Sequence, residues 1–169
     1  MKLRRSYLIP MLLLLACPAF GLQANRGTAE ATVNGKKVSI TYGRPSLKGR
    51  DMLGMMNVGK VWRLGSNQAT EITSAGDLNI NGTSLKAGKY SLWLKKTGDN
   101  SWSLMFHPKT GVWGMPELTE GFVAELPLTM GKASDSAEEL TINLKASGGN
   151  AGTSIHWGTA ELTGSFGVK

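Results

Sequence analysis

Hydrophobic and polar residues alternate with a period of two along most of the chain after residue 30. Aliphatic and aromatic residues occupy every second position in six short segments, at 38–42, 78–80, 90–94, 102–106, 140–144 and 155–157. This period is typical of β-strands that bury one face, and no stretch shows the apolar stripe of a helix. Short strands separated by turn signals predict an all-β fold, namely an antiparallel β-sandwich that is jelly-roll-like or forms a partly closed barrel.

Turns and longer connections are also visible in the sequence. Asn81-Gly82 is favoured in type I′ hairpin turns because both central residues take positive φ, and the glycine-rich 148–152 segment predicts a second hairpin tip. Three segments interrupt the alternation, at 48–60, 107–121 and 131–137. The first two are long for a compact domain, and long loops often carry function.

The N-terminus has a different character. Residues 1–24 form a predicted signal peptide, in which a basic start is followed by an apolar run over 7–16. This run is shorter than the ~20 residues that a membrane-spanning helix needs. A single β-rich domain, 25–169, is expected to follow. Cleavage after Ala24 is favoured, whereas Leu-Leu-Ala-Cys ending at Cys17 resembles a lipobox and offers a lipid anchor as the alternative.

The signal peptide predicts an exported protein, either periplasmic or secreted, or alternatively a membrane-anchored lipoprotein, with no transmembrane span in the mature chain. The full chain has 19 basic and 12 acidic residues, and three of the basic ones lie in the signal peptide, which leaves a net charge of +4. A charge this small, without a basic stripe, argues against nucleic acid as a partner.

No metal or cofactor is predicted. His107 and His156 are far apart in sequence and lack neighbouring ligands at metal-binding spacing, and the glycine-rich 148–152 segment lacks the lysine and helix of a phosphate-binding loop.

Arginine is concentrated in one region. Three of the four arginines of the mature chain, Arg44, Arg50 and Arg63, fall within twenty residues. Because guanidinium groups suit carboxylate, phosphate or sulfate, this region is a candidate site for a small anionic or carbohydrate ligand. The candidate ligand-binding residues are Arg44, Lys48, Arg50, Trp62, Arg63, Asn67, Thr70 and Glu71. In the structural alternative, Asp51 and Glu71 pair with these arginines and lock the segment onto the sandwich.

Two tryptophans are candidates for ligand contact outside the core. Trp93 falls on the strand face opposite Tyr90 and Leu92, which points outward in a sandwich, and Trp113 lies in the second long loop. They either form a sugar-stacking rim or pack together beneath the loop.

The sequence favours a non-enzymatic, ligand-binding or partner-binding envelope protein. The alternative is a hydrolase or lyase that uses Glu71 or Ser46 on an anionic or carbohydrate substrate. No Gly-x-Ser-x-Gly element surrounds a serine, and the mature chain released after Ala24 has no cysteine, so no catalytic residue is assigned.

Several motifs resemble a known bacterial family. The stretches ITYGRPSLKGR at 40–50, GKVWRLGSNQAT at 59–70 and LKAGKYSLW at 85–93, followed by WSLMF and VWG, are similar to the domain-of-unknown-function family numbered 2911. The resemblance implies an exported or lipid-anchored, β-rich protein without established activity. Gln68 stands where a glutamate is common in the family, so a role for that carboxylate is absent from this chain.

Overall fold

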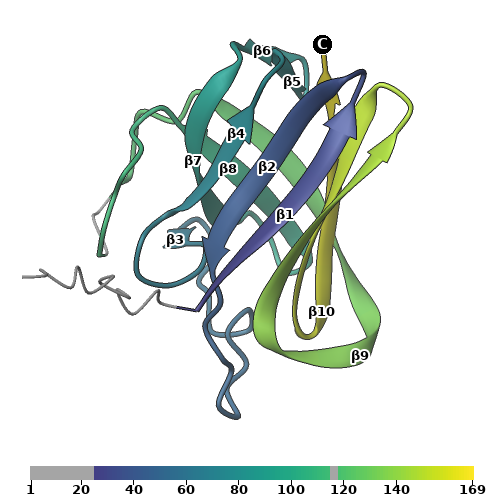
Figure 1. The fold of residues 1–169 in the computed structure, drawn as a ribbon. Coiled ribbons are helices and arrows are strands. Elements are labelled where there is room, and N and C mark those ends of the chain that lie inside the picture. Colours follow the sequence, from purple (N-terminus) through teal and green to yellow (C-terminus); the bar gives the residue numbers. More distant parts are fainter. Residues whose placement is uncertain (1–24, 115–117) are drawn as a thin grey trace, which may run out of the picture.

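The computed structural model describes residues 25–114 and 118–169, which form ten β-strands and contain no helix long and apolar enough to span a bilayer. The strands are β1 (Arg26–Val33), β2 (Lys36–Gly43), β3 (Val61–Arg63), β4 (Thr70–Ser74), β5 (Leu78–Ile80), β6 (Thr83–Leu85), β7 (Gly88–Lys96), β8 (Ser101–His107), β9 (Ala124–Ser147) and β10 (Asn150–Val168). They make one antiparallel sheet in the order β1-β2-β4-β7-β8-β9-β10-β5-β6 (Figure 1). The short β3 pairs with β7 beyond the end of β4. The all-β, sandwich-like fold is thereby confirmed, with a sheet that is not closed.

The second layer of the sandwich comes from two long, bent strands. The first part of β9, from Ala124 to Thr129, pairs with β8, whereas its later part pairs with β10 and packs against β1 (Figure 1). Within the part that pairs with β10 the register shifts, because Lys132 lies opposite Ala160 but Ala137 lies opposite Gly158. The extra residues of β9 form a bulge, which bends a strand and increases its twist. The predicted interruption at 131–137 is therefore a bulge within one strand and not a loop between two.

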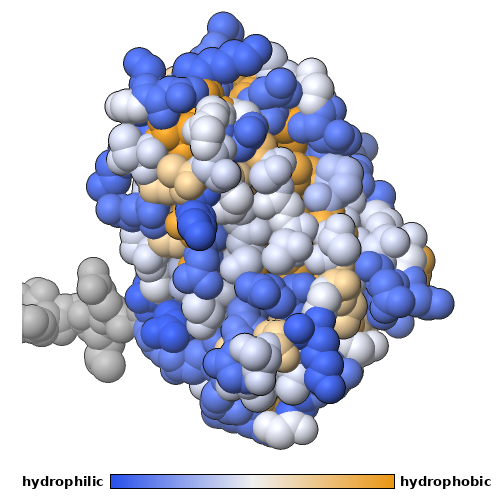
Figure 2. Space-filling view, turned by 90° about the vertical axis from the view of Figure 1, so that its right-hand side faces the viewer, coloured by the Kyte–Doolittle hydropathy of each residue, from blue (hydrophilic) through white to orange (hydrophobic). Residues whose placement is uncertain are grey.

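The alternating residues build the main core between the layers, as the pattern predicts. Its largest fully buried side chains are Trp102, Phe106, Phe166, Ile40, Ile72, Leu78, Ile80, Leu92, Leu94, Leu104, Leu140 and Ile155. Truncating such a side chain, for example Phe106→Ala, costs about 3–5 kcal/mol through lost burial and the cavity left behind. On the side formed by β9 and β10, Figure 2 shows hydrophilic and near-neutral residues with only separated apolar patches. The polar half of the alternation therefore faces solvent there.

The turn chemistry also follows the sequence. Asn81 and Gly82 have φ of 47° and 88°, so the predicted turn with two positive φ values is confirmed. Asn34 and Gly35, with φ of 50° and 73°, make an equivalent turn between β1 and β2 that the sequence analysis did not single out.

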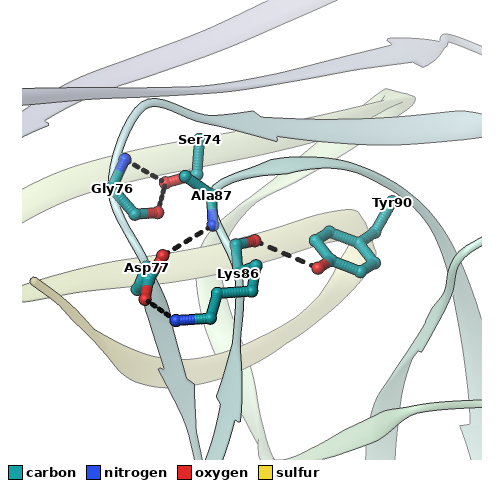
Figure 3. A network of polar contacts seen from close by, with 6 residues as sticks. All are labelled: Ser74, Gly76, Asp77, Lys86, Ala87 and Tyr90. Atoms are coloured by element: carbon teal, nitrogen blue, oxygen red, sulfur yellow. Dashed lines mark hydrogen bonds and ion pairs between the residues drawn. The ribbon is translucent and has the colours of Figure 1, made fainter.

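A polar network joins the β5–β6 hairpin to β7 (Figure 3). Asp77 accepts a hydrogen bond from the Ala87 backbone N–H at 2.8 Å and pairs with Lys86 Nζ at 3.0 Å. The Tyr90 hydroxyl donates to the Lys86 carbonyl oxygen at 3.0 Å. The hydrogen bond from Ala87 and, after it, the one from Lys86 lower the pKa of Asp77. The network closes the end of the sandwich at which the C-terminus lies (Figure 1).

A smaller apolar cluster lies on the outer face of the sheet. Trp93 is only 3% exposed and packs with Ala69, Met105 and Val112, because the segment that follows β8 crosses over this face. The expectation that a loop covers Trp93 is confirmed. Trp113 does not belong to this cluster and is 69% exposed. The outer face of β7 and β8 is thus covered by a loop that leaves one tryptophan in solvent.

Candidate functional site

Arg44 lies on the side of the sheet that faces the second layer. Its Nη2 pairs with Glu139 Oε2 of β9 at 3.2 Å, and the Asn25 side-chain amide donates to Oε1 of the same glutamate at 2.6 Å. This partner is neither Asp51 nor Glu71, the carboxylates that the sequence offered. Arg44 therefore connects the end of β2 to β9.

Lys48 and Arg50 continue along this connection. The Lys48 backbone N–H donates to Glu138 Oε1 at 2.9 Å, and Arg50 Nε donates to the Leu47 carbonyl oxygen at 3.1 Å. Both residues are exposed. Their hydrogen bonds shape the start of the loop, while their charges stay in solvent.

Trp62 and Thr70 shape the segment between β3 and β4. Trp62 lies opposite Leu94 and packs against the main core. Thr70 is fully buried, and its hydroxyl donates to the Leu64 carbonyl oxygen at 2.6 Å. Thr70 therefore holds the 64–70 segment in place, and Trp62 serves in packing.

Glu71 lies on the outer face of β4, in a row of residues that pair laterally across the strands. Thr41, Glu71, Ser91 and His107 are successive partners on β2, β4, β7 and β8. Glu71 is 5% exposed, and its Oε1 accepts a hydrogen bond from the Gly111 backbone N–H at 2.6 Å. Its Oε2 lies 3.4 Å from Lys89 Nζ. Both carboxylate oxygens are thereby occupied.

His107 anchors the same loop. Its Nδ1 accepts a hydrogen bond from the Lys109 backbone N–H at 2.9 Å, and Ser91 Oγ accepts one from Trp93 Nε1 at 3.0 Å. Sequence reasoning missed the alignment of Ser91 and His107 with Glu71, because strand register decides it. The alternation that placed Trp93 outward also places Ser91 outward and was the available signal.

Arg63 lies on this outer face, directly opposite Trp93. Its Nη1 donates to the Gly114 carbonyl oxygen. Its Nε and Nη2 are buried and have no hydrogen-bond partner within 25–114 and 118–169. One complete edge of the guanidinium fork is therefore without an acceptor among these residues.

Arg26, which the sequence analysis did not include, is the second cation of this region. Its Nη1 and Nη2 donate to the carbonyl oxygens of Gln68 and Ala69 at 3.2 and 3.4 Å. Burial, and then the positive charge of Arg26, lower the pKa of Arg63. Neither arginine forms a salt bridge with a carboxylate of the described residues. The two guanidinium groups therefore repel each other without a described counter-ion.

The exposed Asn67 and the half-buried Gln68 border this pair. Asn67 takes a positive φ of 62° in the turn before Gln68, and Gln68 forms an isolated β-bridge with Trp113. Of the eight predicted site residues, the structure brings Arg63 and Asn67 to this place. Arg44, Lys48 and Arg50 lie along the connection to β9, and Trp62, Thr70 and Glu71 serve in packing or loop anchoring.

The fold and this region define an all-β, sandwich-like domain with a pair of arginines on the outer face of its sheet. The chain belongs to the family described as "Protein of unknown function (DUF2911)", whose model matches residues 24–166. No curated protein and no solved structure matches the chain.

Proposed function

We propose that this protein is a non-enzymatic, exported envelope protein that binds a ligand through an anionic group at Arg63 and Arg26. The observation that carries the proposal is the Nε–Nη2 edge of Arg63, which is buried and has no hydrogen-bond partner among residues 25–114 and 118–169. Two parallel N–H donors on one edge match the two oxygens of a carboxylate, phosphate or sulfate. A buried donor without an acceptor costs about 1–3 kcal/mol, so a group that supplies both acceptors is favoured.

The surroundings of Arg63 support an anionic ligand that also carries an apolar or sugar portion. Arg26 adds a second positive charge, which strengthens attraction for an anion. Trp113, 69% exposed and adjacent in sequence to the Gly114 carbonyl that holds Arg63, offers a ring on which a sugar can stack. Because Nη1 of the same guanidinium donates to the Gly114 carbonyl oxygen, we expect the ligand to bind beside the 111–114 segment.

Export rests on the signal peptide predicted over 1–24, which lies outside the described residues. The proposed location is the periplasm or the medium after cleavage at Ala24, or the membrane surface if Cys17 carries a lipid.

The contacts of Glu71 favour binding over hydrolysis or lyase chemistry. A general acid or base needs an oxygen free to exchange a proton with the substrate. The Glu71 oxygens instead accept from Gly111 and pair with Lys89. The other candidate, Ser46, forms a β-bridge with Glu139 and so belongs to the connection to β9 and not to the arginine pair.

Thermal melting tests the proposal with the exported protein. The probes are phosphate, sulfate, acetate, glucuronate and neutral glucose, which separate charge from the sugar ring. An anion at about 100 times its Kd stabilises by ~2.7 kcal/mol, a shift of roughly 5–10 °C for a domain of this size. Arg63→Ala is expected to abolish the shift, and Arg63→Lys to lose most of it because lysine lacks the fork.

Arg50→Ala is the matched control, since Arg50 is an exposed arginine that lies along the connection to β9 and not beside Arg63. Each variant is compared with its own ligand-free melting temperature. The absence of a shift with every anion, or an unchanged shift in Arg63→Ala, would overturn the proposal.

A further inference from the structure

The loop over 48–60, between β2 and β3, presents two apolar side chains to solvent. Met55 and Val58 are 62% and 55% exposed, whereas Leu53 and Met56 are buried in the main core. Figure 1 shows this loop extending beyond the strands at the lower end of the molecule. The loop therefore divides its apolar residues between an anchor in the core and a tip in solvent.

Hydrogen bonds hold the tip in a defined shape. The Met55 N–H donates to the Asp51 carbonyl oxygen at 3.2 Å, and the Gly54 N–H donates to Asp51 Oδ1 at 2.9 Å. The Gly59 N–H donates to the Lys96 carbonyl oxygen of β7 at 2.8 Å. Because these hydrogen bonds fix the backbone at both ends of the tip, the folded structure itself keeps Met55 and Val58 exposed.

Basic residues flank this tip in the sequence. Lys48, Arg50 and Lys60 are all exposed, and Asp51 is the one acidic residue of the loop. Cations beside exposed apolar side chains match the chemistry of an anionic lipid surface, in which headgroup phosphates lie above acyl chains.

We propose that the 48–60 loop docks on an anionic lipid membrane. Met55 and Val58 enter the boundary between headgroups and acyl chains, and Lys48, Arg50 and Lys60 contact the phosphates. The charge complementarity favours lipid over an apolar groove on a protein partner. This contact is separate from the anion site at Arg63, and neither proposal requires the other.

The position of the domain's N-terminal end agrees with this orientation. The Asn25 carbonyl oxygen accepts a hydrogen bond from the Arg44 N–H at 2.9 Å, so the start of the domain adjoins the base of the segment that leads into the loop. A lipid on Cys17 would tether the protein at this same end.

Vesicle binding tests the proposal with the full chain carrying Cys17→Ser, expressed with export. This substitution removes the lipid alternative and the only cysteine of the chain. The protein is expected to co-sediment with phosphatidylglycerol-containing vesicles, to bind pure phosphatidylcholine weakly, and to dissociate as salt rises. Met55→Ser combined with Val58→Ser is expected to lower the bound fraction at least about fivefold.

Val123→Ser is the matched control, because Val123 is an exposed apolar residue of a different segment at 40% exposure. Equal melting temperatures show that the variants remain folded.

A dye that is sensitive to polarity gives a second measurement. It is attached to Met55→Cys in the Cys17→Ser chain, and its emission is expected to shift to the blue on anionic vesicles. The emission of the same dye at Val123→Cys is expected to stay unchanged. Equal binding to phosphatidylglycerol-containing and pure phosphatidylcholine vesicles would overturn the proposal, and so would an unchanged bound fraction in the variant that combines Met55→Ser with Val58→Ser. A failure of the unsubstituted loop to bind any vesicle would also overturn it, in favour of a protein partner.

Discussion

Gly43 at the end of β2 and Ser66 in the segment after β3 approach each other at backbone distance. A Cβ placed on Gly43 would lie 2.2 Å from the Ser66 carbonyl oxygen and 2.8 Å from its nitrogen. No side chain fits in this space. Because Gly43 is also the register partner of Arg26, this contact holds the 64–69 segment beside the arginine pair.

Gly43→Ala is therefore expected to lower the free energy of unfolding by about 1–3 kcal/mol, since the methyl group forces two backbones apart. It should also weaken any anion-induced melting shift, because the Arg26 contacts with Gln68 and Ala69 depend on this segment. Urea unfolding measures the stability. Gly131→Ala is the control, because its new Cβ would meet its nearest neighbour at 3.9 Å and the change should stay within about 1 kcal/mol. Equal effects of the two substitutions would contradict the role of the contact.

Glu71→Gln tests how the loop after β8 is anchored. The substitution removes the charge that accepts from Gly111 and attracts Lys89, and the buried amide that replaces it cannot accept at both positions. We expect a loss of about 1–3 kcal/mol and faster tryptic cleavage after Lys109. Glu30→Gln breaks an exposed pair with Lys37 and should cost less than about 1 kcal/mol. Unchanged cleavage after Lys109 would show that the loop is held by other contacts.

Gln68→Glu introduces a carboxylate at the residue whose carbonyl oxygen already accepts from Arg26. A counter-charge here is expected to raise the melting temperature of the ligand-free protein and to reduce the shift produced by anions. Asn100→Asp makes the same change in charge in an exposed turn and should do neither. If Gln68→Glu left the anion response intact, the ligand would not be held by the charge of this pair.

Asp77 makes the free energy of unfolding depend on pH in the acid range. Its pKa is lowered in the folded protein, mainly by the Ala87 N–H and then by Lys86. A carboxyl group with a lowered folded pKa contributes stability above its unfolded pKa of about 3.9, and that contribution is lost as the pH falls through the folded pKa. Asp77→Asn should therefore be less stable than the native protein at neutral pH, with the difference closing in acid.

Melting temperatures measured against pH at fixed ionic strength check this expectation. Lys86→Met removes the ion pair but keeps the Ala87 hydrogen bond, so it should show the smaller part of the effect. A constant difference between Asp77→Asn and the native protein across the acid range would contradict the linkage.

Much of the fold could be predicted from local sequence. The alternation around Ile40, Leu92 and Leu104 identified the buried faces of strands, because a period of two sends successive side chains to opposite sides. The Asn81-Gly82 turn was equally predictable, since few residues tolerate positive φ. The bulge at 131–137 was not, because a register shift depends on the partner strand and leaves only an interrupted pattern in its own sequence.

The candidate site was predictable in part. Nearness in sequence grouped Arg44, Arg50 and Arg63. In the structure, however, Arg44 pairs with Glu139 of β9, whereas Arg63 lies opposite Trp93 on the outer face of the sheet. Arg26 was overlooked because it lies 37 positions before Arg63, and only the pairing of β1 with β2 brings it close.

The sequence by itself determined six strand segments, the buried face of each and a tight turn at Asn81-Gly82, because these depend on the geometry of a few consecutive residues. Only the tertiary structure decided the partners of the charged groups. Arg44 meets Glu139, Glu71 meets Gly111, and the Nε–Nη2 edge of Arg63 has no acceptor in the part of the chain that the structure describes. These outcomes depend on residues tens of positions away that folding alone brings together.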